Sequence, residues 1–322
     1  GAIRCHPFAY DEITALQNGK LKQFDESFWG HVGHVISNFT RSLLLSISRG
    51  RFASCPVNGP SRRYLQKLSW ASATFAFYAD VAMGTYGGNL KRKEILTGRF
   101  SDALSWMFLA SATVRRFEHE GRKEEDLAIF RHSMDVALAN IQTAFDGIFA
   151  NFDAPVIGGI VRGPISLWSR LNSLGRGPTD VDVDEVARLM QVPGEQRDRL
   201  FDLLYMSTDV NEASGRLENA FVHCFEADKI QAKIRKAISE RLLSKGKPLN
   251  LLDSAVRAGV ISPEEAEQVC AAEKLREDVI QVDGFSEQDY LATAENGGWG
   301  NEPSAERSSD NTLPGSGGLS AA

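Results

Sequence analysis

The sequence predicts an all-α fold: an up-and-down helical bundle followed by a second smaller helical region and a disordered tail. Three observations support this fold class. Apolar residues recur every three or four positions over long stretches, glycine and proline separate these stretches, and apolar residues become sparse beyond Leu291. With 322 residues, of which 43% are apolar, the chain can bury about 75% of its unfolded surface without metal or disulfide support.

Four long helices are expected to form the bundle, and the first covers about residues 20–47. An apolar stripe marks it: Phe24, Phe28, Val32, Val35, Phe39 and Leu43. A loop at 49–63 follows, because four glycines and prolines interrupt regular structure there. Residues 1–63 are therefore expected to be a helix and loop that continue from a missing upstream part.

The other three bundle helices are expected within 64–153. The second covers 65–86 and stops at Gly87 and Gly88, because glycine adopts the left-handed conformation that ends a helix. The third covers about 96–117 and is closed by Gly121. The fourth covers about 124–152, with Pro155 just beyond it. Short connections between long helices favour antiparallel neighbours.

Residues 154–178 form an apolar Gly/Pro segment and linker. The run APVIGGIVRGPISLWSR mixes large apolar residues with Gly158, Gly159, Gly163 and Pro164, so we expect no long regular helix there. Because these apolar residues would be costly to expose, the segment either faces a membrane or is a hairpin buried against the bundle. The candidates for membrane contact are Val156, Ile157, Ile160, Val161, Leu167 and Trp168.

The second helical region is expected at 179–292, with helices near 184–191, 212–243, 249–258 and 263–280. Its clearest signal is the run Ser262-Pro263-Glu264-Glu265, which supplies a cap, a proline at the first helical position and acidic residues in the first turn. Beyond this region, residues 293–322 are rich in Gly, Ser, Pro and Asn and cannot bury a core, so a disordered tail is expected.

Charge and cysteine content exclude several classes of protein. With 42 acidic residues, 36 lysines and arginines and a net charge of −6, we expect no nucleic-acid partner. The four cysteines form no CxxC pair, which favours a cytoplasmic protein without a zinc site or disulfides. The uncharged apolar stretches, at 68–79 and 103–114, are shorter than the roughly 18 residues of a membrane-spanning helix. The chain starts at Gly1 without a signal peptide, so we expect it to be cut from a longer protein.

The histidines and cysteines predict neither a catalytic nor a metal site. His31 and His34 share one helical face, but no third ligand lies near them in the sequence, so packing or surface roles are favoured. His223 and Cys224 are adjacent and would point apart on a helix, which makes a Cys–His pair improbable.

Clusters of charge have structural interpretations as well. Asp180, Asp182 and Asp184 resemble a calcium loop, but its sixth and twelfth positions do not fit, so these residues are expected to complement a helix N-terminus. The glutamates around Gly121 suit a connection between helices. The basic groups 62–63 and 91–93 either attract phosphates or anionic lipid headgroups, or are solvated helix ends.

Several motifs, in order along the chain, carry a family resemblance. GAIRCHP, HVGHVISN, YGGNLKRKE, FLASATVRRFEHEGR and DVALANIQTAFDGIFANF together resemble the C-terminal half of bacterial FadE-type acyl-CoA dehydrogenases. The resemblance continues through ARLMQVP to VIQVDGFS and covers nearly the whole chain except the tail.

The resemblance implies an oxidoreductase of lipid metabolism, a flavoprotein of fatty-acid β-oxidation that converts long-chain acyl-CoA to trans-2-enoyl-CoA with FAD and an electron acceptor. It also implies that the catalytic glutamate and the FAD pocket lie upstream of Gly1. The chain alone is then expected to be inactive, and no catalytic or cofactor-binding residue is assigned to it.

The mitochondrial very-long-chain enzyme has a similar helical extension that assists membrane association. By this analogy we expect a cytoplasmic protein that is peripheral on the inner membrane, with a homodimer as one assembly. The alternative is a stand-alone helical interaction or membrane-docking module without enzymatic activity.

Overall fold

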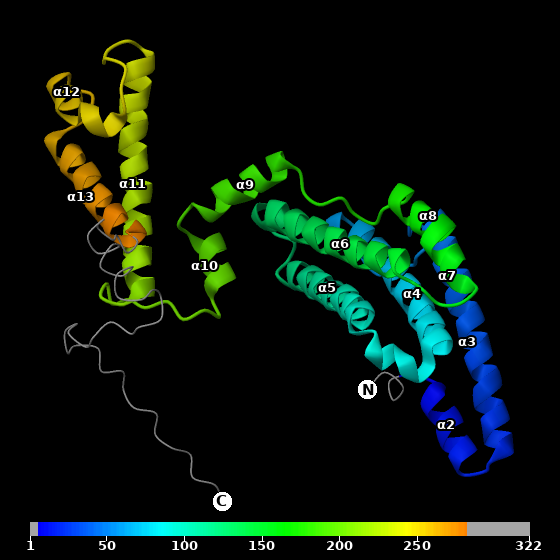
Figure 1. The fold of residues 1–322 in the computed structure, drawn as a ribbon. Helices are drawn as coiled ribbons and strands as arrows, with labels where there is room; N and C mark the ends of the chain where they lie inside the picture. Colours follow the sequence, from blue (N-terminus) through cyan, green and yellow to red (C-terminus); the bar gives the residue numbers. More distant parts are fainter. Residues whose placement is uncertain (1–5, 282–322) are drawn as a thin grey trace, which may run out of the picture. The chain divides into compact units, whose positions relative to one another are not determined.

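The computed structural model describes residues 6–281, which form helices and no strand, so the predicted all-α fold class is confirmed (Figure 1). The start of the GAIRCHP motif and the predicted tail at 293–322 lie outside the described residues. Between residues 6 and 281, no helix has both the length and the apolar character needed to cross a membrane. The chain divides into two compact units, which meet at Leu204 and Tyr205 in the sequence.

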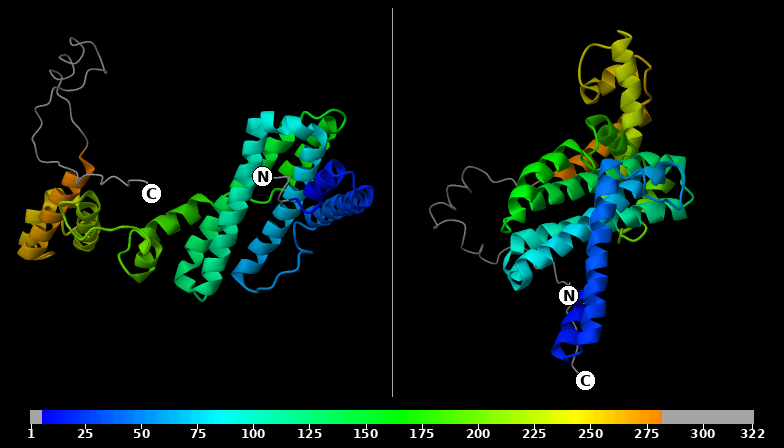
Figure 2. Two further views of the ribbon diagram at one scale, coloured as in Figure 1. Left: turned by 90° about the horizontal axis from the view of Figure 1, so that it is seen from below. Right: turned by 90° about the vertical axis from the view of Figure 1, so that its right-hand side faces the viewer.

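The first unit begins with a helical pair, α2 (Ala9–Gln17) and α3 (Leu21–Ile47). The first bundle helix was predicted correctly as α3, whereas α2 was not predicted. Figure 2 shows α2 beside the N-terminal part of α3, which it contacts. The pair packs closely because Gly30 has no side chain: a Cβ there would lie 2.6 Å from Cε1 of Phe8.

The core of the first unit lies between α4 (Pro60–Tyr86), α5 (Glu94–His119) and α6 (Leu127–Ala150), which confirm the other three predicted helices. The short helices η1 (Gly87–Arg92) and η2 (Glu124–Asp126) connect them. Gly87 and Gly121 have φ angles of 51° and 86°, the left-handed conformation expected at these helix ends. Aromatic rings join the helices: Phe117 stacks on Phe130 with ring centroids 4.2 Å apart.

The apolar Gly/Pro segment is more helical than the sequence predicted. It forms α7 (Ile157–Ile160), the π-helical turn η3 (Val161–Ile165) and α8 (Ser166–Leu171) without a break. Pro164 lies inside the wide turn, which accommodates a residue that has no N–H group to donate. The proline therefore distorts the helix rather than ending it.

Two further helices, α9 (Asp180–Met190) and α10 (Glu195–Phe201), also belong to the first unit. α9 starts earlier than predicted because Thr179 and Asp182 form a capping box. α9 contacts α6, and the side chains of α10 bind the connection between α5 and α6. The domain boundary expected at 178–179 therefore lies later, after Leu204.

The second unit contains α11 (Ala213–Ser239), η4 (Pro248–Leu251), α12 (Leu252–Arg257) and α13 (Pro263–Ile280). Ser262 caps α13, accepts a hydrogen bond from the Glu265 N–H and completes a capping box, which confirms the predicted start. The core of this unit is small and built mainly from α11 and α13: Ala227, Ile230, Ile234, Leu252, Ala255, Ile261, Val269 and Ala272.

Candidate docking surface

The predicted membrane-contact residues divide between the surface and the core of the first unit. Val156 is 91% exposed and Leu167 is 59% exposed, and Ile157, Ile160 and Trp168 are exposed as well. Val161, by contrast, is only 1% exposed and packs in the core. Val161 was therefore wrongly predicted as a surface residue, because the helical turn of the segment directs it towards the bundle.

Hydrogen bonds fix α8 against α3. The indole Nε1 of Trp168 donates to Ser46 Oγ at 2.8 Å, and Asn172 Nδ2 donates to the Ser46 carbonyl oxygen at 2.7 Å. Both acceptor atoms belong to Ser46 in the last turn of α3, so α8 lies beside that end of α3. One face of the segment is buried on the bundle and the other face is exposed.

The end of α3 adds apolar residues to the same face. Phe39, Leu43 and Ile47 are exposed and follow one another at helical spacing. Phe39 and Leu43 line a cavity together with Trp168, so exposed apolar residues of α3 and of the Gly/Pro segment lie next to each other in one surface region. We call it the α3–α8 surface and define it by Phe39, Leu43, Ile47, Ile157, Ile160, Leu167 and Trp168.

Beneath this surface lies a cavity of about 210 Å³ between α3, α4, α6 and α8. Its polar lining groups bond mainly to one another: Gln142 Nε2 donates to Ser169 Oγ at 2.8 Å, and Ser42 and Thr74 pair their hydroxyls at 3.4 Å. No lysine or arginine lines this cavity. Its lining therefore offers no cationic side chain to the pyrophosphate of FAD.

A cluster of histidines forms where α2, α3 and α4 meet. One ligand atom each from His6, His31 and Asp80 lies within 4.8 Å of the others, an arrangement that could hold a metal ion. However, Nδ1 of His6 accepts hydrogen bonds from the N–H groups of Phe8 and Ala9 at 3.2 and 2.9 Å. The ring proton therefore resides on Nε2, which donates to Asp80 Oδ1 at 3.1 Å and has no lone pair left for a metal.

No local pattern in the sequence indicates this cluster, because His6 and Asp80 are far from the His31 and His34 pair along the chain. Tertiary packing brings the third histidine, His6, and the Asp80 carboxylate to His31. His31 Nδ1 lies 2.8 Å from Glu12 Oε1, so α2 is bound to α3 through this histidine as well.

The remaining candidates have structural roles in the part of the chain described. His223 Nδ1 bonds to the Asn219 carbonyl oxygen and Cys224 Sγ faces the Ala272 carbonyl oxygen, so these neighbours point apart as predicted. Burial raises the pKa of the Cys224 thiol, which makes it a poor nucleophile. Asp182 caps α9, and the hydrogen bonds from Thr179 lower the pKa of its carboxyl group.

Of the basic group 91–93, Lys93 forms an ion pair with Asp153, which follows the end of α6. Lys93 Nζ lies 2.7 Å from Asp153 Oδ2, and the Tyr86 hydroxyl donates to Asp153 Oδ1 at 2.7 Å. Burial and this hydrogen bond raise the pKa of Tyr86 to about 12. Lys91 and Arg92 remain exposed.

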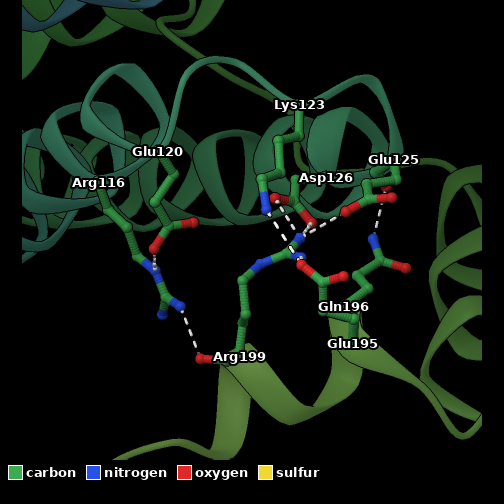
Figure 3. A network of polar contacts seen from close by, with 8 residues as sticks. All are labelled: Arg116, Glu120, Lys123, Glu125, Asp126, Glu195, Gln196 and Arg199. Carbon is green, nitrogen blue, oxygen red and sulfur yellow. Dashed lines mark hydrogen bonds and ion pairs between the residues drawn. The ribbon is translucent and has the colours of Figure 1, made fainter.

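Two of the glutamates around Gly121, Glu120 and Glu125, belong to a network that holds α10, which Figure 3 shows in close-up. Arg199 of α10 bonds to both carboxylate oxygens of Asp126 at 3.0 Å and to Glu125 Oε1 at 2.7 Å. Arg116 bridges Glu120 and the Arg199 carbonyl oxygen. These carboxylates serve to dock a helix through charge-assisted hydrogen bonds.

The fold and this surface define a class of protein: an all-α domain with an exposed apolar face. A comparison with protein families matches residues 3–285 to the family described as acyl-CoA dehydrogenase, C-terminal, bacterial type. The chain belongs to this family of C-terminal domains, which is part of an oxidoreductase family. No solved structure matches the chain.

Proposed function

We propose that this chain is the docking part of an FAD-dependent acyl-CoA dehydrogenase of fatty-acid β-oxidation. Membership of the C-terminal domain family is the observation that carries the proposal. The upstream core binds FAD, supplies the catalytic glutamate and converts long-chain acyl-CoA to trans-2-enoyl-CoA, passing electrons to an acceptor. The lack of a cationic side chain around the cavity between α3, α4, α6 and α8 supports this division of labour.

The division of labour is tested with the 322-residue chain by itself. Purified from cells supplied with riboflavin, the chain should show no flavin absorbance at about 450 nm. It should not oxidise acyl-CoA either, because hydride transfer needs a bound flavin. Flavin that copurifies in a stoichiometric amount, or acyl-CoA oxidation by this chain, would contradict the proposal.

We further propose that the α3–α8 surface docks the enzyme on the inner membrane. Its apolar residues include a tryptophan whose indole lies at the protein surface, and Arg162 and Arg170 lie on the same helical segment. Tryptophan and arginine beside aliphatic residues are typical of helices that lie in the interface of a bilayer. A homodimer that covers this surface is the competing occupant.

Flotation with lipid vesicles distinguishes docking through the α3–α8 surface from nonspecific hydrophobic adsorption. The variant Ile160→Ser/Leu167→Ser removes two exposed side chains that make no hydrogen bonds, and it should reduce flotation with anionic vesicles several-fold because apolar area is lost. Leu104→Ser/Phe108→Ser, on the exposed face of α5, is the matched control and should float like the unmodified chain. Equal losses in both variants would contradict the proposal. A concentration-dependent dimer that only the first variant abolishes would favour the homodimer.

A further inference from the structure

Four cationic residues gather where the loop after α3 meets α4. Gly50, with a φ angle of 81°, packs its backbone directly on α4, since a Cβ there would lie 2.6 Å from the Gln66 carbonyl oxygen. Gln66 Nε2 in turn donates to the Arg51 carbonyl oxygen at 3.3 Å. These contacts hold Arg49 and Arg51, the two neighbours of Gly50, beside α4.

α4 contributes the other two members, Arg63 and Lys67. They are four residues apart and therefore lie one above the other on the helix, next to the point where Gly50 packs. Burial, followed by repulsion from Arg51 and Arg49, lowers the pKa of Arg63. Burial and Arg63 likewise lower the pKa of Lys67. We call Arg49, Arg51, Arg63 and Lys67 the arginine cluster.

The positive charge of the arginine cluster is poorly compensated. Asp135 acts on Lys67 and favours its charged form. Within residues 6–281, none of the three arginines forms an ion pair, and Nη1 of Arg63 is buried without a hydrogen-bond partner. This concentration of positive charge occurs in a chain whose net charge is −6. Holding like charges together costs free energy that a bound anion would recover.

We propose that the arginine cluster binds a phosphoryl group. Guanidinium groups present forked N–H donors that match two phosphate oxygens, and several arginines can bind one dianion. Arg49 and Arg51 are exposed and Arg63 is half-buried, so the ligand approaches from solvent and rests on α4. The phosphoryl group belongs either to a soluble phosphate ester or to a phospholipid headgroup. The site shares no residue with the α3–α8 surface and does not depend on the proposed function.

Titration calorimetry of the 322-residue chain tests the site, with inorganic phosphate and glycerol 3-phosphate as probes at constant ionic strength. The variant Arg49→Gln/Arg51→Gln changes two exposed side chains and should weaken phosphate binding by about tenfold or more, because two charge-assisted contacts are lost. The control Lys91→Gln/Arg92→Gln removes the same charge from another exposed basic group and should leave the affinity unchanged.

Vesicles identify the source of the phosphoryl group. Phosphatidylcholine vesicles with phosphatidic acid present a phosphomonoester, whereas vesicles of equal charge with phosphatidylglycerol do not. Binding of the soluble probes that the cluster variant weakens supports a soluble ligand. Preference for phosphatidic acid that the cluster variant abolishes, without binding of the soluble probes, supports a lipid headgroup. No binding in either arm, or equal losses in the cluster and control variants, would overturn the proposal.

Discussion

At the scale of single residues, His6 couples the protonation of one ring to the packing of α2. Its Nδ1 accepts two backbone N–H groups at the start of α2, and its Nε2 proton reaches Asp80. Burial is the main reason why the pKa of His6 is lowered. Since the folded state favours the neutral ring, this contribution to stability is present above the unfolded pKa of about 6.5 and decreases as the pH falls towards the lowered folded value.

Hydrogen exchange should reveal this dependence. After correction for intrinsic rates, protection of the α2 amides should decrease as the pH falls from about 7 to 5.5, because a protonated Nδ1 cannot accept hydrogen bonds. In His6→Asn, which does not titrate, the protection should be lower at both values and independent of pH. An equal pH dependence in this variant would show that another group is responsible.

Val156 has a backbone conformation that suits glycine better than valine. Its φ and ψ angles are 65° and −58°, and the Ile157 N–H donates to the Pro155 carbonyl oxygen at 2.7 Å, which together define a γ-turn of the strained form. A β-branched residue is rare at such angles. The side chain is exposed and gains little from packing in return.

The variant Val156→Gly should therefore raise the free energy of unfolding of the first unit by about 1 kcal/mol, since the relieved strain exceeds the entropy that glycine loses. Thermal unfolding followed by circular dichroism measures the change. Val192→Gly replaces another exposed valine, outside the left-handed region, and should not stabilise. A lower melting temperature for Val156→Gly would mean that valine is not strained there.

At the scale of secondary structure, the helices that the sequence revealed are those with long apolar stripes. α3, α4, α5 and α6 were predicted because burial of one face repeats over several turns. α2 and α10 were not predicted. Both are short, and polar contacts from distant residues hold them: His6 and His31 for α2, and the network around Arg199 for α10.

Removal of the Arg199 side chain should release α10. The hydrogen bond to Glu125, followed by the bonds to Asp126, raises the pKa of Arg199, so the charged form is the one that docks. In Arg199→Ala, limited proteolysis should cut near residues 192–204 several-fold faster than in the unmodified chain, because loosely held segments are cut first. Arg188→Ala removes an exposed pair with Asp184 within α9 and serves as the control. Unchanged cleavage in Arg199→Ala would show that apolar contacts hold α10.

At the scale of the whole molecule, each of the two units has a core of its own. Leu138 is fully buried in the first unit, and Ile234 is fully buried in the second. The two cores draw on separate sets of helices, so each unit is expected to unfold as its own cooperative transition.

Matched core variants test this independence. Leu138→Ala should destabilise the first unit, and Ile234→Ala the second, each by about 2–5 kcal/mol through lost burial and a cavity. Differential scanning calorimetry should show that each variant shifts one transition and leaves the other in place. If either variant shifted both transitions together, the units would form a single cooperative structure.

The sequence by itself determined the fold class, the four long helices, most of the second unit and the family. These properties follow from periodic burial, helix-ending glycines, caps and motifs, all of which are local along the chain. Only the tertiary structure decided that Val161 lies in the core while Leu167 is exposed, that His6 and Asp80 join His31, and that the loop carrying Arg49 and Arg51 packs on α4 beside Arg63. Such contacts join residues that are distant in sequence, and their positions depend on how whole helices pack, which no local pattern specifies.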